Sequence, residues 1–118
     1  GVVYTAPEIA SLGATEDTLK EAGIAHAVGK FHFIANGRAR AMGATDGLVK
    51  VLGDAETGRI LGAHVIGRNA GELIQELVLA MASGATLEQV AATSHAHPGI
   101  SEAIKEACLA ALGKPLHM

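Results

Sequence analysis

The sequence predicts an α+β fold in which helices pack on an antiparallel sheet. Segments with the apolar pattern of strands lie mainly in the first 66 residues and are separated by short polar turns. From residue 69 onward, apolar residues recur at the spacing of a helix. Strands that precede helices in this way are typical of α+β domains, whereas regular alternation indicates a parallel sheet. With no internal repeat and no linker, the chain is expected to form one domain over residues 1–118.

The first predicted elements are short. Residues 1–6 form an apolar run before a proline, and residues 8–14 have the pattern of a strand. Thr15 is a favourable N-cap, and the acidic residues after it suit the positive end of a helix dipole. We expect a short helix from there to Ala22, which Gly23 ends.

Four more strands are predicted before residue 67. They cover residues 26–34, 38–42, 48–52 and 59–66. The first two are joined by Asn36-Gly37, a dipeptide typical of turns. The last two are joined by a polar loop at residues 54–58, which predicts an antiparallel hairpin with Lys50 facing outward.

Three helices are predicted in the second half of the chain. They cover residues 69–83, 87–92 and 101–112, and the second of them is a short helix or a turn. In the first helix, apolar residues recur at i, i+3, i+4 and i+7, namely Ile74, Leu77, Val78 and Met81. This spacing predicts a broad apolar face. Gly84 and Gly113 stand where helices commonly end.

Composition and charge exclude several classes of function. The net charge of −3 and the pI near 6.0 argue against binding to nucleic acid or to an anionic membrane. The single cysteine, Cys108, excludes an internal disulfide and a cysteine-based zinc site, and it favours a reducing compartment. With 49% hydrophobic residues, we expect an apolar face that another domain or subunit covers. We expect neither a membrane span nor a signal peptide.

The residues best suited to chemistry lie between positions 93 and 103. His97 precedes Pro98, which favours an extended backbone, and Glu102 follows where the last helix begins. A chain that turns from extended to helical here can bring the Glu102 carboxylate to one imidazole nitrogen. The other nitrogen then stays free for acid–base catalysis. The positive end of the helix disfavours an imidazolium and Glu102 favours it, so the net effect is left open.

The spacing of His97 and Glu102 does not by itself require catalysis. A histidine and a glutamate five residues apart near a helix start are more often a structural cap or a surface pair than a catalytic pair. A less favoured alternative is a metal site formed by His95, His97 and His117. The remaining polar or reactive side chains are interpreted as structural, solvated or core residues: His26, His32, His64, Arg38, Glu72, Glu76 and Cys108.

Five segments, in order, resemble one known family. SHAHPGISEA at residues 94–103 resembles the H-P-T-x-S-E signature of the pyridine nucleotide–disulfide oxidoreductases, and the additional His95 resembles their dihydrolipoamide dehydrogenase branch. The other four segments are YTAPEIASLG, VGKFHFIANGRA, TDGLVKVLGDAETGRILGAHVIG and AGELI. Together they cover nearly the whole chain, which makes the resemblance far more specific than the spacing of His97 and Glu102.

The resemblance implies a homodimeric flavoenzyme with FAD and NAD, of which this chain is the C-terminal dimerisation domain. It implies that His97 takes a proton from a dihydrolipoyl thiol across the dimer interface and that Glu102 holds and polarises His97. It also implies that the main-chain carbonyl of His97 lies near the flavin of the partner subunit. The expected partner is a lipoyl-bearing protein of a 2-oxoacid dehydrogenase or glycine-cleavage complex, in the cytoplasm or, in a eukaryote, the mitochondrial matrix. A purely structural dimerisation module and the same domain of a sister flavoprotein disulfide reductase are the alternatives.

Two motifs of the family do not occur in the sequence. It contains no C-x4-C disulfide motif and no G-x-G-x-x-G fingerprint. We therefore expect the FAD and NAD domains to lie outside this chain, and the chain alone to bind neither cofactor nor metal and to be inactive. Gly99 stands where the family has a threonine, which removes half of a capping box. Because glycine is an acceptable cap, Gly99→Thr is expected not to reduce activity.

Overall fold

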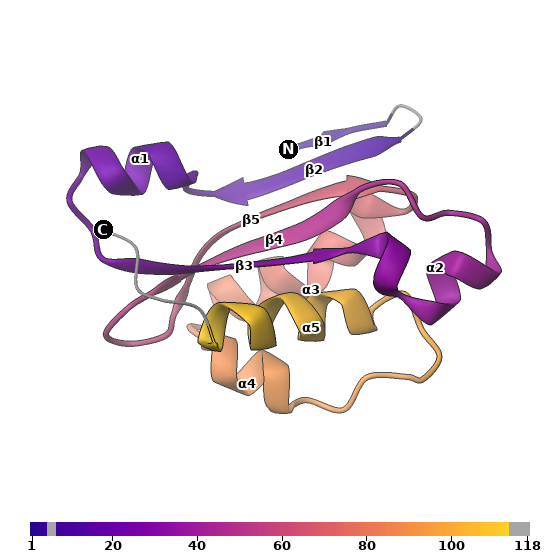
Figure 1. Cartoon of the computed structure of the whole chain (residues 1–118). Coiled ribbons are helices and arrows are strands. Elements are labelled where there is room, and N and C mark those ends of the chain that lie inside the picture. Colours follow the sequence, from indigo (N-terminus) through magenta and orange to yellow (C-terminus); the bar gives the residue numbers. More distant parts are fainter. Residues whose placement is uncertain (5–6, 114–118) are drawn as a thin grey trace.

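The computed structural model describes residues 1–4 and 7–113, and it confirms the α+β class. Five strands form one antiparallel sheet in the order β1-β2-β5-β4-β3 (Figure 1). The strands are β1 (Val2–Val3), β2 (Glu8–Gly13), β3 (His26–His32), β4 (Leu48–Asp54) and β5 (Ile60–Gly67). The helices are α1 (Glu16–Glu21), α2 (Gly37–Ala41), α3 (Ala70–Ala82), α4 (Leu87–Ala92) and α5 (Glu102–Leu112), with a 3-10 turn η1 (Phe33–Ala35) after β3.

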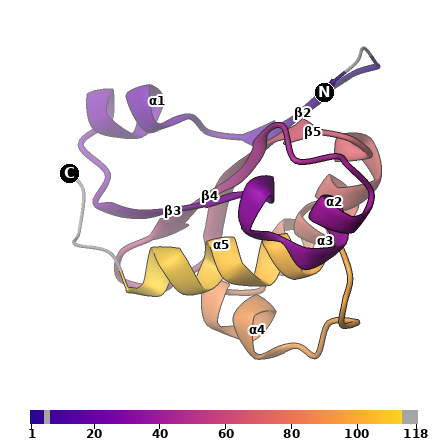
Figure 2. The same ribbon diagram turned by 45° about the vertical axis from the view of Figure 1, so that its right-hand side comes forward.

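The helices divide between the two faces of the sheet. Helices α3, α4 and α5 lie together on one face, and α1 lies toward the opposite face (Figure 1). Helix α2 follows the end of β3 and lies beside the start of α5 (Figure 2). The segment that joins α4 to α5 returns from the outer side of the helical layer to this same end of the molecule (Figure 2). Residues far apart in the sequence therefore meet there.

The predicted hairpin of β4 and β5 is present. Val51 lies opposite Ala63 across the two strands, and both side chains are fully buried beneath the helices. The Asp54 carboxylate accepts hydrogen bonds from the backbone N–H groups of Glu56 and Thr57 at 2.8 and 3.0 Å. These bonds close the loop and hold the pKa of Asp54 below its usual range.

The core is mostly aliphatic, because the sequence has no tryptophan, one tyrosine and two phenylalanines. Leu77 of α3 and Ile104 of α5 are fully buried in the cluster that also contains the inward valines of the sheet. Gly29 on β3 allows α5 to approach the sheet closely, because a Cβ at this position would collide with the carbonyl oxygen of Ala107. The backbone of the last helix is thus held directly against an edge strand.

The prediction for residues 33–42 is wrong. Strand β3 ends at His32, and the buried Phe33 begins the 3-10 turn η1. The expected strand over residues 38–42 is helix α2 instead. Asn36 is its N-cap, because its side-chain oxygen accepts from the Ala39 N–H at 2.8 Å. Asparagine favours both turns and helix caps, and the sequence offered no signal that separates the two here.

The other predicted helices are present with small differences. Thr15 and Thr18 form a reciprocal capping box at α1, and Gly23 follows with φ +68°. Residues 87–92 are a helix rather than a turn. In α3, the exposed Val78 is not part of the buried face, which comprises Ala70, Gly71, Leu73, Ile74, Leu77 and Ala80. Among the described residues, no helix is long and apolar enough to cross a membrane.

Candidate active site

The segment of residues 93–101 carries one of the two predicted site residues, His97, and ends beside the other. It runs from the C-terminal end of α4 to the start of α5, where Glu102 is the first helical residue (Figure 2). Backbone N–H groups of Glu102 and Ala103 donate to the carbonyls of Gly99 and Ile100, three residues earlier in each case. This tight turn reverses the chain so that the first helical side chain lies close to the segment before it.

His97 and Glu102 are in direct contact. The His97 Nδ1 atom lies 2.8 Å from the Glu102 Oε1 atom. The His97 side chain is 81% exposed, and the Glu102 side chain is 28% exposed. Because an ionised carboxylate only accepts hydrogen bonds, Nδ1 carries the proton and donates it. In a neutral ring the lone pair then lies on Nε2, which has no hydrogen-bond partner within the described residues.

Glu102 is held as a carboxylate by two donors. The Gly99 N–H donates to Oε1 at 3.1 Å, and this bond, followed by the one from His97, keeps the pKa of Glu102 below its ordinary value. The contact with Gly99 is one of the two hydrogen bonds of a capping box, in which a glutamate side chain accepts from the backbone N–H group three residues earlier. An ionised Glu102 can fix the ring orientation and the tautomer of His97, with the proton on Nδ1.

Gly99 has tighter surroundings than the sequence suggests. Its carbonyl accepts a hydrogen bond from the Asn36 Nδ2 atom at 3.1 Å. A Cβ at this position would lie 2.6 Å from the Ala96 carbonyl oxygen, closer than real Cβ atoms approach backbone. This geometry disagrees with the expectation that Gly99→Thr is tolerated, because the backbone must shift to admit a side chain. Asn36 was missed as a site residue because its partner is 63 residues away.

A second contact between a histidine and a glutamate lies beside that of His97 with Glu102. The His95 Nε2 atom is 2.7 Å from the Glu76 Oε2 atom of α3, and His95 Nδ1 is 2.8 Å from the Thr93 carbonyl oxygen. Glu76 therefore has a specific partner within the chain, which the interpretation as a solvated edge or interface residue missed. Residues two apart in a regular strand share a face, so spacing alone did not indicate that His95 is shielded while His97 is exposed.

The metal alternative has no support in the described part of the chain. Both ring nitrogens of His95 already face oxygen atoms. No group of three or more histidine, cysteine, aspartate or glutamate side chains there is placed to hold a metal ion. His117, the third proposed ligand, lies outside the described residues.

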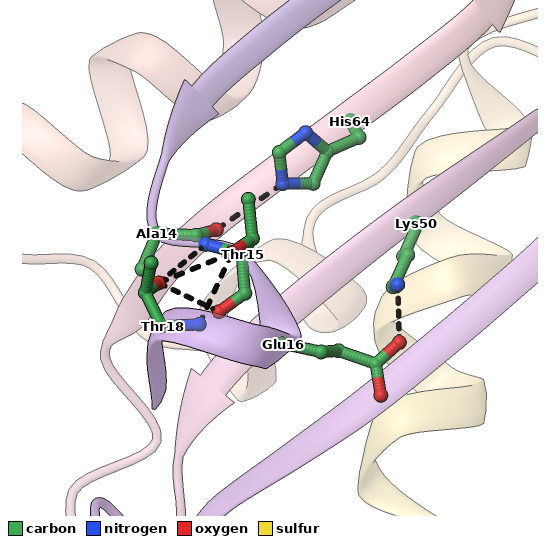
Figure 3. A network of polar contacts seen from close by, with 6 residues as sticks. All are labelled: Ala14, Thr15, Glu16, Thr18, Lys50 and His64. Atoms are coloured by element: carbon green, nitrogen blue, oxygen red, sulfur yellow. Dashed lines mark hydrogen bonds and ion pairs between the residues drawn. The ribbon is translucent and has the colours of Figure 1, made fainter. Parts of the chain in front are cut away.

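Other predicted structural histidines are held by backbone oxygens. His64 on β5 has its Nε2 atom 3.1 Å from the Ala14 carbonyl, next to the cap of α1 (Figure 3). In the same region Lys50 forms an ion pair with Glu16, so it faces away from α3–α5, and this contact holds the pKa of Glu16 below its ordinary value. Buried His26 has its Nδ1 atom 2.8 Å from the Ile24 carbonyl.

The family of the chain follows from comparison with known proteins. Residues 1–108 match the dimerisation domain of the pyridine nucleotide-disulphide oxidoreductases. The chain belongs to this family. The dimerisation domain is 55% identical over 118 residues to dihydrolipoyl dehydrogenase 2, mitochondrial, of Arabidopsis thaliana. It is 56% identical over 117 residues to dihydrolipoyl dehydrogenase of Trypanosoma brucei brucei.

These matches cover almost all of the dimerisation domain but a small part of its relatives. They include 100% and 99% of this chain, and 23% and 24% of the two relatives. The solved structure of the Cu(II) complex of RclA, a flavoprotein disulfide reductase from Escherichia coli, superposes with a TM-score of 0.89 at 28% identity. That match covers 97% of this chain and 25% of the other. The chain thus spans about a quarter of the length of the curated relatives it matches.

The dimerisation domain exposes several large apolar side chains. Membership of the family implies homodimer formation in the enzymes that carry this domain. Leu79 on α3 is 70% exposed, and Leu109 and Leu112 on α5 are each 43% exposed. An apolar face covered by another domain or subunit is therefore still the expectation for this surface.

Cys108 is not placed for redox chemistry. Its side chain is fully buried in the core, and this burial, with the charge of Glu76 as a smaller cause, raises the pKa of the Cys108 thiol to about 12. A thiol that stays protonated and shielded is a poor nucleophile. The interpretation of Cys108 as a core residue agrees with this position.

Proposed function

We propose that the chain is the dimerisation domain of a dihydrolipoyl dehydrogenase and that His97 is its general base, oriented by Glu102. The observation that carries this proposal is the contact of 2.8 Å between His97 Nδ1 and Glu102 Oε1, in an exposed histidine whose Nε2 atom is unpartnered within the described residues. Relatives at 55% and 56% identity over the whole domain are named dihydrolipoyl dehydrogenases, which supports this assignment.

The proposed chemistry is proton transfer at Nε2 of His97. In the overall reaction a dihydrolipoyl dithiol loses two electrons and two protons to become a disulfide, and NAD takes up a hydride while one proton is released. Nε2 takes the proton of one thiol, so that the resulting thiolate can attack the redox disulfide of the partner subunit. Glu102 stabilises the imidazolium that forms, because its carboxylate already accepts from Nδ1.

The remaining parts of the active site are assigned to the rest of the full-length enzyme. The redox disulfide is placed there because the one cysteine of this chain, Cys108, is buried. The FAD and NAD domains are placed there because no dinucleotide fingerprint occurs in residues 1–118. When bound to those domains, FAD and NAD would supply the electron-accepting chemistry of the reaction. We further propose that the main-chain carbonyl of His97 lies near the flavin of the partner subunit in the homodimer, and that the chain alone is inactive.

The expected partner is a lipoyl-bearing protein of a 2-oxoacid dehydrogenase or glycine-cleavage complex. This follows from the dihydrolipoyl substrate, which such proteins carry. The enzyme would work in the cytoplasm or, in a eukaryote, in the mitochondrial matrix, and the mitochondrial name of the Arabidopsis relative is consistent with the second location.

The test is His97→Gln in the full-length enzyme, assayed by NADH formation from dihydrolipoamide. Loss of the general base should lower kcat by about 10²- to 10⁴-fold while FAD content and the dimer are retained. His32→Gln is the matched control, because His32 is an exposed histidine on β3 outside the site. Unchanged turnover of His97→Gln would instead make the domain a purely structural module. Reduction of another disulfide with no activity on lipoamide would make the protein a sister reductase.

A further inference from the structure

We propose that His95 is a positioning residue, which holds His97 in place for proton transfer through its contact with Glu76 on α3. The inference rests on the proposed function, because it assigns His95 a role toward the general base of that reaction. The two histidines are separated only by Ala96, yet their surroundings differ sharply. The His95 side chain is 5% exposed, whereas the His97 side chain is 81% exposed.

Both ring nitrogens of His95 face acceptors. Nδ1 is 2.8 Å from the Thr93 carbonyl oxygen, and Nε2 is 2.7 Å from the Glu76 carboxylate. The contact with Glu76 joins a ring nitrogen to a carboxylate oxygen, and hydrogen bonds to carboxylates are among the shortest and strongest in proteins. The His95 side of this contact is shielded from solvent.

This contact matters because the segment around His97 has few others. Two hydrogen bonds join residues 93–99 to parts of the described chain other than α4 and α5. One is the contact of His95 with Glu76, and the other is the bond from Asn36 Nδ2 to the Gly99 carbonyl. The first lies two residues before His97 and the second lies two residues after it. The segment that carries the exposed histidine is thus held on both sides of it, by the shielded His95 side chain and by the buried Asn36 side chain.

A general base depends on such support. A displacement of about 1 Å at a reacting group can lower the rate about 100-fold. Within the described residues, the His97 ring has one hydrogen bond, to Glu102, and most of its side chain is exposed to solvent. Its backbone position is therefore determined by its neighbours rather than by packing of its own ring. Removal of the contact between His95 and Glu76 should leave the base present but misplaced.

The test compares His95→Ala in two backgrounds of the full-length enzyme. With His97 present, we expect kcat for dihydrolipoamide oxidation to fall about 10-fold or more, with KM changing less. In the His97→Gln background, the same substitution should change kcat less than about twofold, because its effect acts through His97. His64→Gln is the matched control, since it also removes a histidine bonded to a backbone carbonyl but lies away from the segment.

Two substitutions at Glu76 test the same contact from its other side, in case His95→Ala has a folding defect. Glu76→Ala removes the acceptor from a partly exposed position and should reproduce the loss, whereas Glu76→Gln keeps an oxygen for the Nε2–H group and should retain most of the activity. Equal losses of kcat in both His97 backgrounds, or no loss in either, would overturn the positioning role. If His97→Gln alone leaves turnover unchanged, the proposed function fails, and that result is separate from any effect of His95.

Discussion

Asn36→Ala should show how strongly the site segment depends on a distant buried side chain. Asn36 is 4% exposed, and its side chain makes two hydrogen bonds, one as an acceptor and one as a donor. Its Oδ1 atom accepts from the Ala39 N–H at 2.8 Å and caps α2, and its Nδ2 atom donates to the Gly99 carbonyl at 3.1 Å. Alanine removes both bonds but adds no bulk, so the loss should come from these contacts alone.

The free energy of unfolding should fall by about 2 kcal/mol. Loss of an asparagine N-cap costs about 1 kcal/mol. Loss of the bond to Gly99 costs about 1 kcal/mol more, because that carbonyl still accepts from the Glu102 N–H at 3.3 Å and is not left unpaired. For a domain of this size, a loss of about 2 kcal/mol corresponds to a fall in Tm of roughly 8 °C.

Urea unfolding of the 118-residue chain, followed by circular dichroism, measures this difference. Asn36→Asp keeps the cap but turns a buried acceptor toward the Gly99 carbonyl in place of the donor, so at neutral pH it should cost at least the roughly 1 kcal/mol of the lost bond. Asn69→Gly is the matched control, because Asn69 precedes α3 without a side-chain cap and has φ 62°, which glycine adopts freely. If Asn36→Ala unfolds with the free energy of the unchanged chain, or if Asn69→Gly loses as much, the reasoning is refuted.

Two further predictions concern ionisation. Because the Gly99 N–H and then His97 hold the pKa of Glu102 below its ordinary value, the stability from these contacts is present above the unfolded pKa and is lost as the pH falls through the folded pKa. A carbon-13 NMR titration should place the Glu102 midpoint below that of an unfolded glutamate, and an equal or higher midpoint would contradict this. Burial raises the pKa of Cys108 to about 12, so iodoacetamide at about pH 8 should label the unfolded chain and not the folded one. Mass spectrometry measures the labelling, and equal rates in both states would show that Cys108 is accessible.

The fold was predictable wherever one local pattern determined one element. The alternation in β4 and β5 and the threonine cap at α1 each correspond to a single structure, and all three are present. Residues 33–42 were mispredicted because Asn36 followed by glycine fits both a turn and a helix cap. In the structure, the same side chain that caps α2 also bonds to Gly99, which lies 63 residues away and is invisible to local patterns.

The same distinction applies to the candidate site. The contact of His97 with Glu102 spans five residues, so a helix start after a proline was enough to predict it. The contact of His95 with Glu76 spans 19 residues and depends on how α3 packs beside the segment. Local spacing therefore predicted the contact of His97 with Glu102, the family resemblance supplied its proposed catalytic role, and only the folded chain reveals the groups around it.

The two contacts on either side of His97 also restrict chain length. His95 is bonded to Glu76 of α3, and Gly99 is bonded to Asn36, the N-cap of α2. The residues between His95 and Gly99 must span the distance between these two contacts with His97 facing solvent. One added or deleted residue would move His97 relative to Glu102 even if every side chain were kept. Connecting segments usually tolerate insertions and deletions. Here homologous sequences should instead show changes of length in other connections, such as the polar loop at residues 55–58, and none between residues 95 and 99.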